Sequence, residues 1–412
     1  MHPTLDTRDT VCVVRQPILD QGGRVFGYEL VYREESPEAE AASEDLARAR
    51  VITDAVLSLG LDTLTDGLPA FIPLSRELLV RDSGTLLPPA STVLELPEGV
   101  DPDEEILAAC KKLHGLGYKL ALNGLGTSQA TQVLAPLVKF IKLDAGELPE
   151  AQRLALPAEF AAKGIQLIAK RVETFAAARE LQKAGYTFFQ GYYFCKPDTV
   201  GTEALPGRRL AYLNLLTALN KPDVGIAEIE DLVKHDLTLS YRVLRSINSA
   251  SFGLRREVTS IRQALVLLGI GQIQKWASVW AMAGLNSGGT SETVSMAIIR
   301  ARSCELLGNR LLGQEVGAEY FLLGLCSLLD SMLRRPMEDA LAEVPVSDTI
   351  KAALLGQQNT ARAVLDAVTA YERGEWELAA DAANQGLFDP ELLPVAYAEA
   401  LRWSRELTRA AK

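Results

Sequence analysis

The sequence predicts an α/β region followed by an all-helical region, and three observations support this. From Val11 to Pro197, short runs rich in β-branched and aromatic residues alternate with amphipathic helical runs. After Pro197 the strand pattern stops, and helical runs follow one another to the C-terminus. Between the two lies "KPDTVGTEALPG", whose proline and glycine content is typical of a linker. We therefore predict domains at residues 8–200 and 208–412, joined by a linker at 201–207.

Strand candidates and helical runs alternate through the first region. The strand candidates are "VCVVRQPIL", "VFGYELVYR", "AFIPLS", "TVLELPE", "KLALNG", "FIKLD", "IQLIAKRV" and "YTFFQGYYF". Helical runs such as "PDEEILAACKKLHGLG" and "ETFAAARELQKAG" lie between them and end at a glycine, a usual signal for a helix end. Apolar strands that alternate with helices indicate a parallel sheet covered on its outer face. This many strands in so short a region favours a small closed barrel over an open sheet.

The second region is predicted to consist of helices alone. Its runs include "LAYLNLLTALN", "IAEIEDLVKHD", "SIRQALVLLG" and "QIQKWASVWAMAG". One run carries apolar side chains at helical spacing and is interpreted as core: Leu237, Leu239, Val243, Leu244 and Ile247. Three tryptophans are interpreted as core or interface residues, since no basic groove surrounds them: Trp276, Trp280 and Trp403.

Composition and charge exclude several classes of protein. The chain has 412 residues, 48% of them apolar and 23% charged, which is ordinary for a globular protein. Its net charge is −11, and neither half has the basic excess expected of a nucleic-acid-binding surface. No apolar run is long enough to span a membrane, and the N-terminus does not resemble a signal peptide. Five scattered cysteines without a CxxC pair indicate a reducing, cytoplasmic compartment and no zinc site.

The C-terminal ends of the predicted strands carry the candidate functional residues, because such barrels place their functional groups there. Two acids, Glu29 and Glu95, and two lysines, Lys142 and Lys170, occupy these ends. A two-metal phosphodiester hydrolase needs several carboxylates that converge to hold the ions and deprotonate water. Position alone leaves open whether the two acids are functional or ordinary rim residues. The other strand ends carry Pro73, Asn123, Gly124, Asp144, Glu173 and Gln190.

Motifs along the first region resemble EAL domains, the cyclic di-GMP phosphodiesterases. "RQPILD…GRVFGYELVYR" matches the opening of that family, with Glu29-Leu30-Val31 at the position of its Glu-Ala-Leu motif. "PLS", "LELPE", "LNGLGTS", "FIKLD", "IAKRVET" and "FFQGYYFCKP" follow in the family's order, so the resemblance covers about residues 11–197. The resemblance implies a modified TIM barrel.

The same resemblance implies that the catalytic machinery is incomplete. The family's metal ligands include two glutamates that this chain keeps, and an Asn and two Asp residues that it replaces. Its general base, a glutamate, corresponds to Lys170. We therefore predict that the chain is not an enzyme, has no catalytic residues and binds no metal, Mg²⁺ included. The vestigial positions of the family's site are Glu29, Pro73, Glu95, Asn123, Gly124, Lys142, Lys170 and Gln190.

Ligand binding is a separate question from catalysis. Arginine suits a phosphate or a guanine edge because its planar fork donates two hydrogen bonds. The alternative is that the polar residues near the first two strands brace the barrel and bind no nucleotide. The resemblance implies that the candidate residues for binding cyclic di-GMP are Gln16, Glu29, Leu30, Arg33 and Gln190.

A physical hypothesis concerns the charges at the strand ends. Without metal, Glu29 and Glu95 should repel one another, which raises the pKa of at least one of them. The ammonium groups of Lys142 and Lys170 are expected to take the place of cations and neutralise the acids. The alternative for Lys170 is that its side chain points into solvent.

The second region resembles the HDOD domain from about residue 210 to 283. Such domains are similar to the HD hydrolases but lack their metal-binding His-Asp pairs, and here Ser327 and Leu328 stand where a catalytic relative has that pair. His235 is interpreted as a residue at a helix C-terminus and not as a ligand. The hallmark residues of the family correspond to Asp236, Leu244, Asn248-Ser249-Ala250, Ala264 and Leu267-Leu268-Gly269, of which Asn248 and Ser249 are expected to cap a helix or anchor a turn.

The order of the two regions resembles a class of two-domain bacterial signalling proteins. We predict a cytoplasmic, non-catalytic regulator that contacts other signalling or regulatory proteins, with cyclic di-GMP as a candidate ligand and with neither nucleic acid nor membrane as a partner. The oligomeric state is left open. One alternative is a scaffold that binds no nucleotide. Another is a weak phosphodiesterase, in which Asp144 and Glu173 gather Mg²⁺ together with Glu29 and Glu95.

Overall fold

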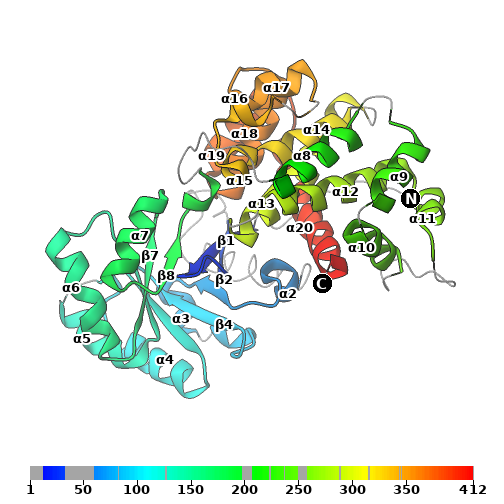
Figure 1. Ribbon diagram of the computed structural model, residues 1–412. Coiled ribbons are helices and arrows are strands. Elements are labelled where there is room, and N and C mark those ends of the chain that lie inside the picture. Colours follow the sequence, from blue (N-terminus) through cyan, green and yellow to red (C-terminus); the bar gives the residue numbers. More distant parts are fainter. Residues whose placement is uncertain are drawn as a thin grey trace. The chain divides into compact units, whose positions relative to one another are not determined.

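In the computed structural model the chain divides into two compact units (Figure 1). One unit contains the described residues up to Phe194 together with Glu372–Trp376, and the other contains the remaining described residues from Cys195 onward. The linker predicted at 201–207 lies outside the described residues except for Gly207, so the predicted domain boundaries stay a prediction. The described residues are 13–32, 60–196 and 207–411, apart from 82, 126–127, 222–223, 236, 249–257, 287–288, 314–315, 343 and 345.

The first unit is a closed eight-stranded barrel with helices around its outside, which confirms the predicted barrel (Figure 1). The strands follow the order of the chain: β1 (Val13–Asp20), β2 (Val25–Tyr32), β3 (Ala70–Pro73), β4 (Thr92–Leu96), β5 (Lys119–Asn123), β6 (Phe140–Asp144), β7 (Gln166–Lys170) and β8 (Phe188–Gln190). The described helices of this unit are α2 (Leu61–Thr65), α3 (Arg76–Val80), α4 (Glu104–Gly115), α5 (Ser128–Leu134), α6 (Glu150–Ala161) and α7 (Phe175–Ala184).

One strand departs from the predicted parallel sheet. β1 pairs antiparallel with both β2 and β8, whereas the neighbouring pairs from β2 to β8 are all parallel. The physical reason is the short connection between β1 and β2, which contains only residues 21–24. So short a turn joins antiparallel strands, whereas parallel strands need a crossover of a dozen or more residues.

Helix caps explain where the barrel helices begin and end. Asp103 accepts a hydrogen bond from the Ile106 amide at the start of α4, and Thr174 does the same for Ala177 at the start of α7. α7 ends at Gly185, which takes a left-handed φ of 106° that glycine adopts without steric cost. The predicted glycine stop of this helix is therefore confirmed.

An apolar core fills the barrel toward the N-terminal ends of the parallel strands. Phe26 stacks on Phe188 with ring centroids 4.2 Å apart, and both contact the ring of Phe140. The core cluster contains one residue from each strand except β2: Ile18, Phe71, Val93, Ala121, Phe140, Ile168 and Phe188. Polar side chains inside the barrel are consequently displaced toward the opposite end.

In the second unit, all regular secondary structure among the described residues is helical, as the sequence predicts. The long helix α13 packs against α14 and α20. Among the described residues, no helix combines the length and apolar character that crossing a membrane requires. The helices are α8 (Gly207–Leu219), α9 (Ile226–His235), α10 (Leu237–Ile247), α11 (Ile261–Leu268), α12 (Ile270–Leu285), α13 (Ser291–Leu312), α14 (Gly317–Cys326), α15 (Leu329–Leu333), α16 (Met337–Ala340), α17 (Asp348–Leu354), α18 (Thr360–Glu372), α19 (Trp376–Gln385) and α20 (Leu392–Ala411).

Several interpretations of the helical region are confirmed. The amide of Asn248 donates to the Val258 carbonyl and its carbonyl accepts from the Val258 amide, both at 2.8 Å, so this side chain anchors the chain after α10. His235 is exposed and is the last residue of α9. The core interpretation holds for Leu239, Val243, Ile247, Trp276 and Trp280, which are buried. Asp236, Ser249 and Ala250 lie outside the described residues.

Candidate functional site

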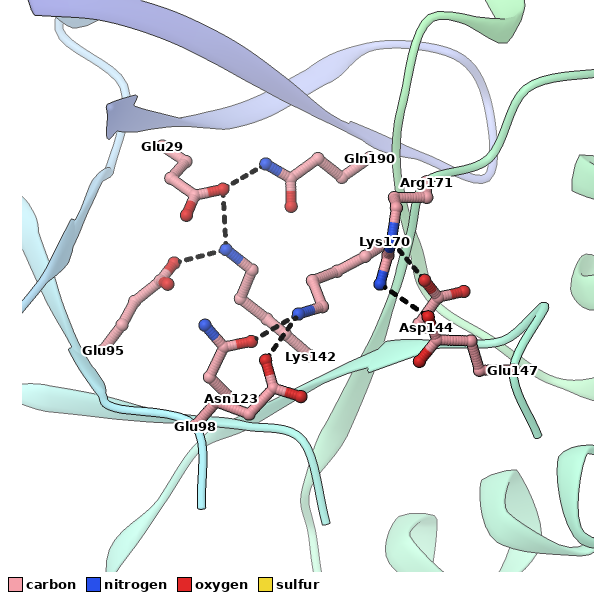
Figure 2. A network of polar contacts seen from close by, with 10 residues as sticks. All are labelled: Glu29, Glu95, Glu98, Asn123, Lys142, Asp144, Glu147, Lys170, Arg171 and Gln190. Carbon is pink, nitrogen blue, oxygen red and sulfur yellow. Dashed lines mark hydrogen bonds and ion pairs between the residues drawn. The ribbon is translucent and has the colours of Figure 1, made fainter. Parts of the chain in front are cut away.

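A buried lysine lies at the centre of a polar cluster inside the barrel (Figure 2). Lys142, from β6, is fully buried, and its Nζ lies 2.8 Å from Glu29 Oε2 and 2.7 Å from Glu95 Oε1. Since Glu29 belongs to β2 and Glu95 to β4, one ammonium group joins three strands. Lys142 therefore pairs with both acids, as expected, and its single positive charge balances one of the two carboxylates. Burial of these charges is tolerable because each is paired.

The two-residue period of the strands places these side chains inside the barrel. Val93 and Phe140 belong to the apolar core, and Glu95 and Lys142 follow each of them by two positions. Residues two apart on a strand share a face, so both charged residues point inward, one layer nearer the C-terminal rim. The same spacing from a core residue applies to Pro73, Asn123, Lys170 and Gln190.

Burial and ion pairing give the two acids opposite pKa shifts. Burial raises the pKa of Glu95 to about 7, and the Glu29 carboxylate contributes to this rise, against the attraction of Lys142. The buried Oε2 of Glu95 has no hydrogen-bond partner that would stabilise its charge. Burial also disfavours ionisation of Glu29, but Lys142 and Gln190 outweigh it and lower the pKa of Glu29. The predicted rise in the pKa of one acid is confirmed.

The raised pKa of Glu95 predicts that the protein becomes less stable as pH rises from about 5 to about 8. An unfolded Glu95 has a pKa of 4.5 and a folded one about 7. Between these values the folded state retains a proton that the unfolded state has lost, so the free energy of unfolding decreases with rising pH. Glu95→Gln should abolish this part of the decrease. The melting temperatures of the wild type and of Glu95→Gln between about pH 5 and about pH 8 measure this effect. If both fell equally with rising pH, the pKa of Glu95 would not be the cause.

Lys170 acts on the two acids through its charge and not through a direct contact. Its Nζ donates to Asn123 Oδ1 at 2.7 Å and lies 3.7 Å from Glu98 Oε2 (Figure 2). Its positive charge helps to lower the pKa of Glu29 and opposes the rise in the pKa of Glu95, as expected of a neutralising group. The side chain is 18% exposed, so the alternative that it points into solvent is wrong. Register separates it from the acids: Lys142 pairs with Ile168, and Lys170 lies two residues further toward the rim.

Two of the vestigial positions contribute main-chain groups. The carbonyl of Pro73 accepts a hydrogen bond from the Tyr32 hydroxyl at 3.0 Å. The amide of Gly124 donates to the Lys142 carbonyl at 2.8 Å, with φ at 79°, a conformation that favours glycine. A Cβ at position 124 would lie in van der Waals contact with Glu98, at 3.4 Å.

Three of the five candidate nucleotide-binding residues, Gln16, Glu29 and Gln190, lie next to one another. The Gln190 amide donates to Glu29 and lies 3.4 Å from Gln16 Oε1. Gln16 in turn donates to the main-chain carbonyl of Arg373, which belongs to the same compact unit, at 3.0 Å. Leu30 is buried, and Arg33 lies outside the described residues. Their role in binding stays a prediction.

Acidic residues on the loops after the strands also belong to the polar network, and the sequence did not single out two of them. Arg171 contacts Asp144 and lies 2.9 Å from Glu147, while Glu98 lies near Lys170 (Figure 2). Arg171 has a left-handed φ of 53°. Asp144 was recognised as a strand-end acid. Glu98 and Glu147 were missed, although their position just after a strand was a usable signal.

The donor set of the described residues does not fit a two-metal centre. No three histidine, cysteine, aspartate or glutamate side chains among them come together in a way that could hold a metal ion. Glu29 and Glu95 are suitably placed acids, yet both are bound to Lys142, whose positive charge opposes a cation. A metal ion at this place would have to displace that ammonium group.

A closed barrel with polar groups at its C-terminal rim, followed in the chain by a helical region, defines a TIM-like barrel protein with a second, all-helical domain. The EAL domain model matches residues 4–197 and the HDOD domain model matches residues 205–331. The chain therefore belongs to the EAL family and carries an HDOD domain after it, which makes it an EAL-HDOD signalling protein related to cyclic di-GMP phosphodiesterases.

Two relatives are similar over nearly their whole length. The "Uncharacterized protein YuxH" of Bacillus subtilis (strain 168) is 31% identical over 409 residues, which are 97% of this chain and 99% of the relative. The "Cyclic di-GMP phosphodiesterase CdgJ" of Vibrio cholerae serotype O1 is 30% identical over 416 residues, 99% of this chain and 95% of the relative. Among solved structures, the manganese/cy-diGMP complex of Klebsiella pneumoniae BlrP1 at pH 9.0 is 21% identical, covers 47% of this chain and 57% of its own, and has a TM-score of 0.39.

The prediction that the chain is not an enzyme is wrong on this comparison. A relative that matches 99% of the chain is named a cyclic di-GMP phosphodiesterase. That prediction rested on the substituted residues at the strand ends, taken one by one. Asp144 was recognised as a further acid there, but Glu98 and Glu147, which also belong to the network at the rim, were not. Substitutions such as Lys170 for the family's glutamate do not by themselves establish loss of activity.

Proposed function

We propose that this signalling protein binds cyclic di-GMP at the C-terminal rim of its barrel. The observation that carries the proposal is the contact between Glu29 and Gln190 in the polar cluster, since both are residues for which the resemblance implies dinucleotide contacts. The Vibrio cholerae relative is named for this dinucleotide, which supports the same ligand. Binding is proposed to need no Mg²⁺, because the Lys142 ammonium already lies between the two acids, where its positive charge opposes a metal cation.

The helical region is proposed to contact another signalling or regulatory protein. Nucleotide binding would influence that contact if the dinucleotide has different affinities for two conformations of the chain, since coupling between sites is reciprocal. The proposal places this function in the cytoplasm. The free thiols of Cys110, Cys304 and Cys326, all buried, suit a reducing compartment.

The decisive experiment is a calorimetric titration of cyclic di-GMP into the full chain, in Mg²⁺ and again in EDTA. We expect binding in both buffers and its loss in Arg33→Ala. Arg24→Ala is the matched control, because Arg24 is exposed in the turn between β1 and β2, at the opposite end of β2 from the rim. Folded protein that releases no heat in either buffer would overturn the proposal.

Hydrolysis of cyclic di-GMP is a second candidate function, favoured by the name of the Vibrio cholerae relative. Glu29 and Glu95 are the acids placed to take part. The titrated samples can be separated by chromatography after long incubation with Mg²⁺ or Mn²⁺. A linear dinucleotide product that is absent with Glu29→Gln would establish this function, and intact ligand throughout would exclude it.

A further inference from the structure

Lys170 differs from the other cations of the polar network in what it contacts. Its ammonium group donates to the neutral side-chain carbonyl of Asn123 at 2.7 Å. The carboxylate oxygen recorded near it, Glu98 Oε2, lies at 3.7 Å, on a side chain that is 72% exposed. The side chain of Lys170 itself is 18% exposed, so it is reachable from the rim yet held in place (Figure 2).

The charges of the neighbouring cations are balanced at close range. Lys142 lies between two carboxylates at 2.8 and 2.7 Å. Arg171 contacts Asp144 and lies 2.9 Å from Glu147. Among the described residues, no carboxylate lies as close to the Lys170 ammonium group. An ammonium group has three hydrogens to donate, and Asn123 takes one of them.

We propose that Lys170 is a phosphate-binding residue, whose ammonium group contacts a phosphate oxygen of the bound cyclic dinucleotide directly. This inference rests on the proposed function of the barrel. The exposed Glu98 carboxylate has room to rotate away, and the phosphate then replaces a distant, solvated partner with a close one. The side chain of Lys170 thus supplies a positive charge to the phosphate, as a metal ion would otherwise do.

The position of Lys170 supports this role. It is the last residue of β7, two residues after the core residue Ile168, and therefore faces the barrel interior at the rim. Its charge already acts on the site, since it contributes to lowering the pKa of Glu29. Asn123, from β5, holds the ammonium group in place before any ligand arrives, which reduces the entropy lost on binding.

The test compares cyclic di-GMP affinities of full-length variants by calorimetry in EDTA. Lys170→Gln keeps a polar side chain that is one atom shorter but removes the charge, and we expect affinity to fall about tenfold or more, as for loss of a charged hydrogen bond. Lys170→Arg should retain most of the affinity. Lys163→Gln is the matched control: Lys163 lies just before β7, at the opposite end of the strand, and is 44% exposed.

A second variant tests the role of Glu98 without risk to the fold, because that side chain is mostly exposed. Glu98→Gln removes the acid that competes with the phosphate for Lys170, so binding should tighten. The gain should disappear when Lys170→Gln is present as well. The dependence of affinity on salt concentration should also weaken in Lys170→Gln, since one ionic contact is lost.

The outcomes separate this inference from the proposed function. Wild-type protein that does not bind cyclic di-GMP would refute the proposed function. Wild-type protein that binds, with Lys170→Gln and Glu98→Gln both within about twofold of it, would overturn the role of Lys170 alone, because a charged hydrogen bond contributes more than that. Weakened binding in Lys170→Gln with Lys163→Gln unchanged supports the assignment.

Discussion

Replacing Lys142 with methionine is expected to lower the free energy of unfolding by about 3–5 kcal/mol, the usual cost of leaving a buried charge without its partner. The ammonium group is fully buried and is the cation recorded between Glu29 and Glu95. Without it, two carboxylates remain close together inside the barrel. Methionine has a similar length and leaves no large cavity, so the loss reports on charge and not on packing.

Calorimetric unfolding of the full chain measures this effect, with the transition of the barrel unit followed near pH 8. The loss should shrink toward pH 5, because the unpaired acids become protonated and no longer repel each other. Adding Glu29→Gln and Glu95→Gln to Lys142→Met should restore most of the stability for the same reason. If Lys142→Met alone were as stable as the wild type, the ion pairs would not be a structural element of the barrel.

Much of the fold was predictable because local patterns encode it. The strands from β2 to β8 fall within predicted runs, and β1 extends past its run by one residue, Asp20. Helices lie between consecutive strands from β2 to β8, and several of them end at recognisable signals. The antiparallel direction of β1 was missed although the sequence contains its cause. Four residues, Gln21 to Arg24, separate β1 from β2, and that length requires a hairpin.

The candidate site was predictable in part, and the limit is a physical one. The position of a residue at a strand end determines which way its side chain points, so Glu29, Glu95 and Lys142 were found together. Which residues then meet depends on the register between neighbouring strands and on the course of the loops. The alternation of side chains along a single strand determines neither this register nor the course of the loops. The pairing of Lys170 with Asn123 and the approach of Glu98 are consequences of those long-range features.

The helical domain supplies the second large effect, at the contact between helices α13 and α14. Gly324 of α14 is buried against the backbone of α13, and a Cβ atom there would lie 2.3 Å from the carbonyl carbon and oxygen of Arg300 and 2.4 Å from the amide nitrogen of Ala301. Contacts this short cannot be relieved by turning a side chain, because both partners are main-chain atoms. The two helices would have to separate.

Gly324→Ala should therefore destabilise the helical unit by about 2–3 kcal/mol or more, since overpacking outweighs the gain in helix propensity of up to about 1 kcal/mol. Gly271→Ala is the matched control: Gly271 also lies in a helix, α12, but it is exposed and a Cβ there meets nothing within 4 Å. Gly271→Ala should leave the free energy of unfolding unchanged or raise it slightly. Thermal unfolding followed by helical circular dichroism compares the two. Equal stabilities would show that α13 and α14 do not approach each other as closely as these backbone contacts require.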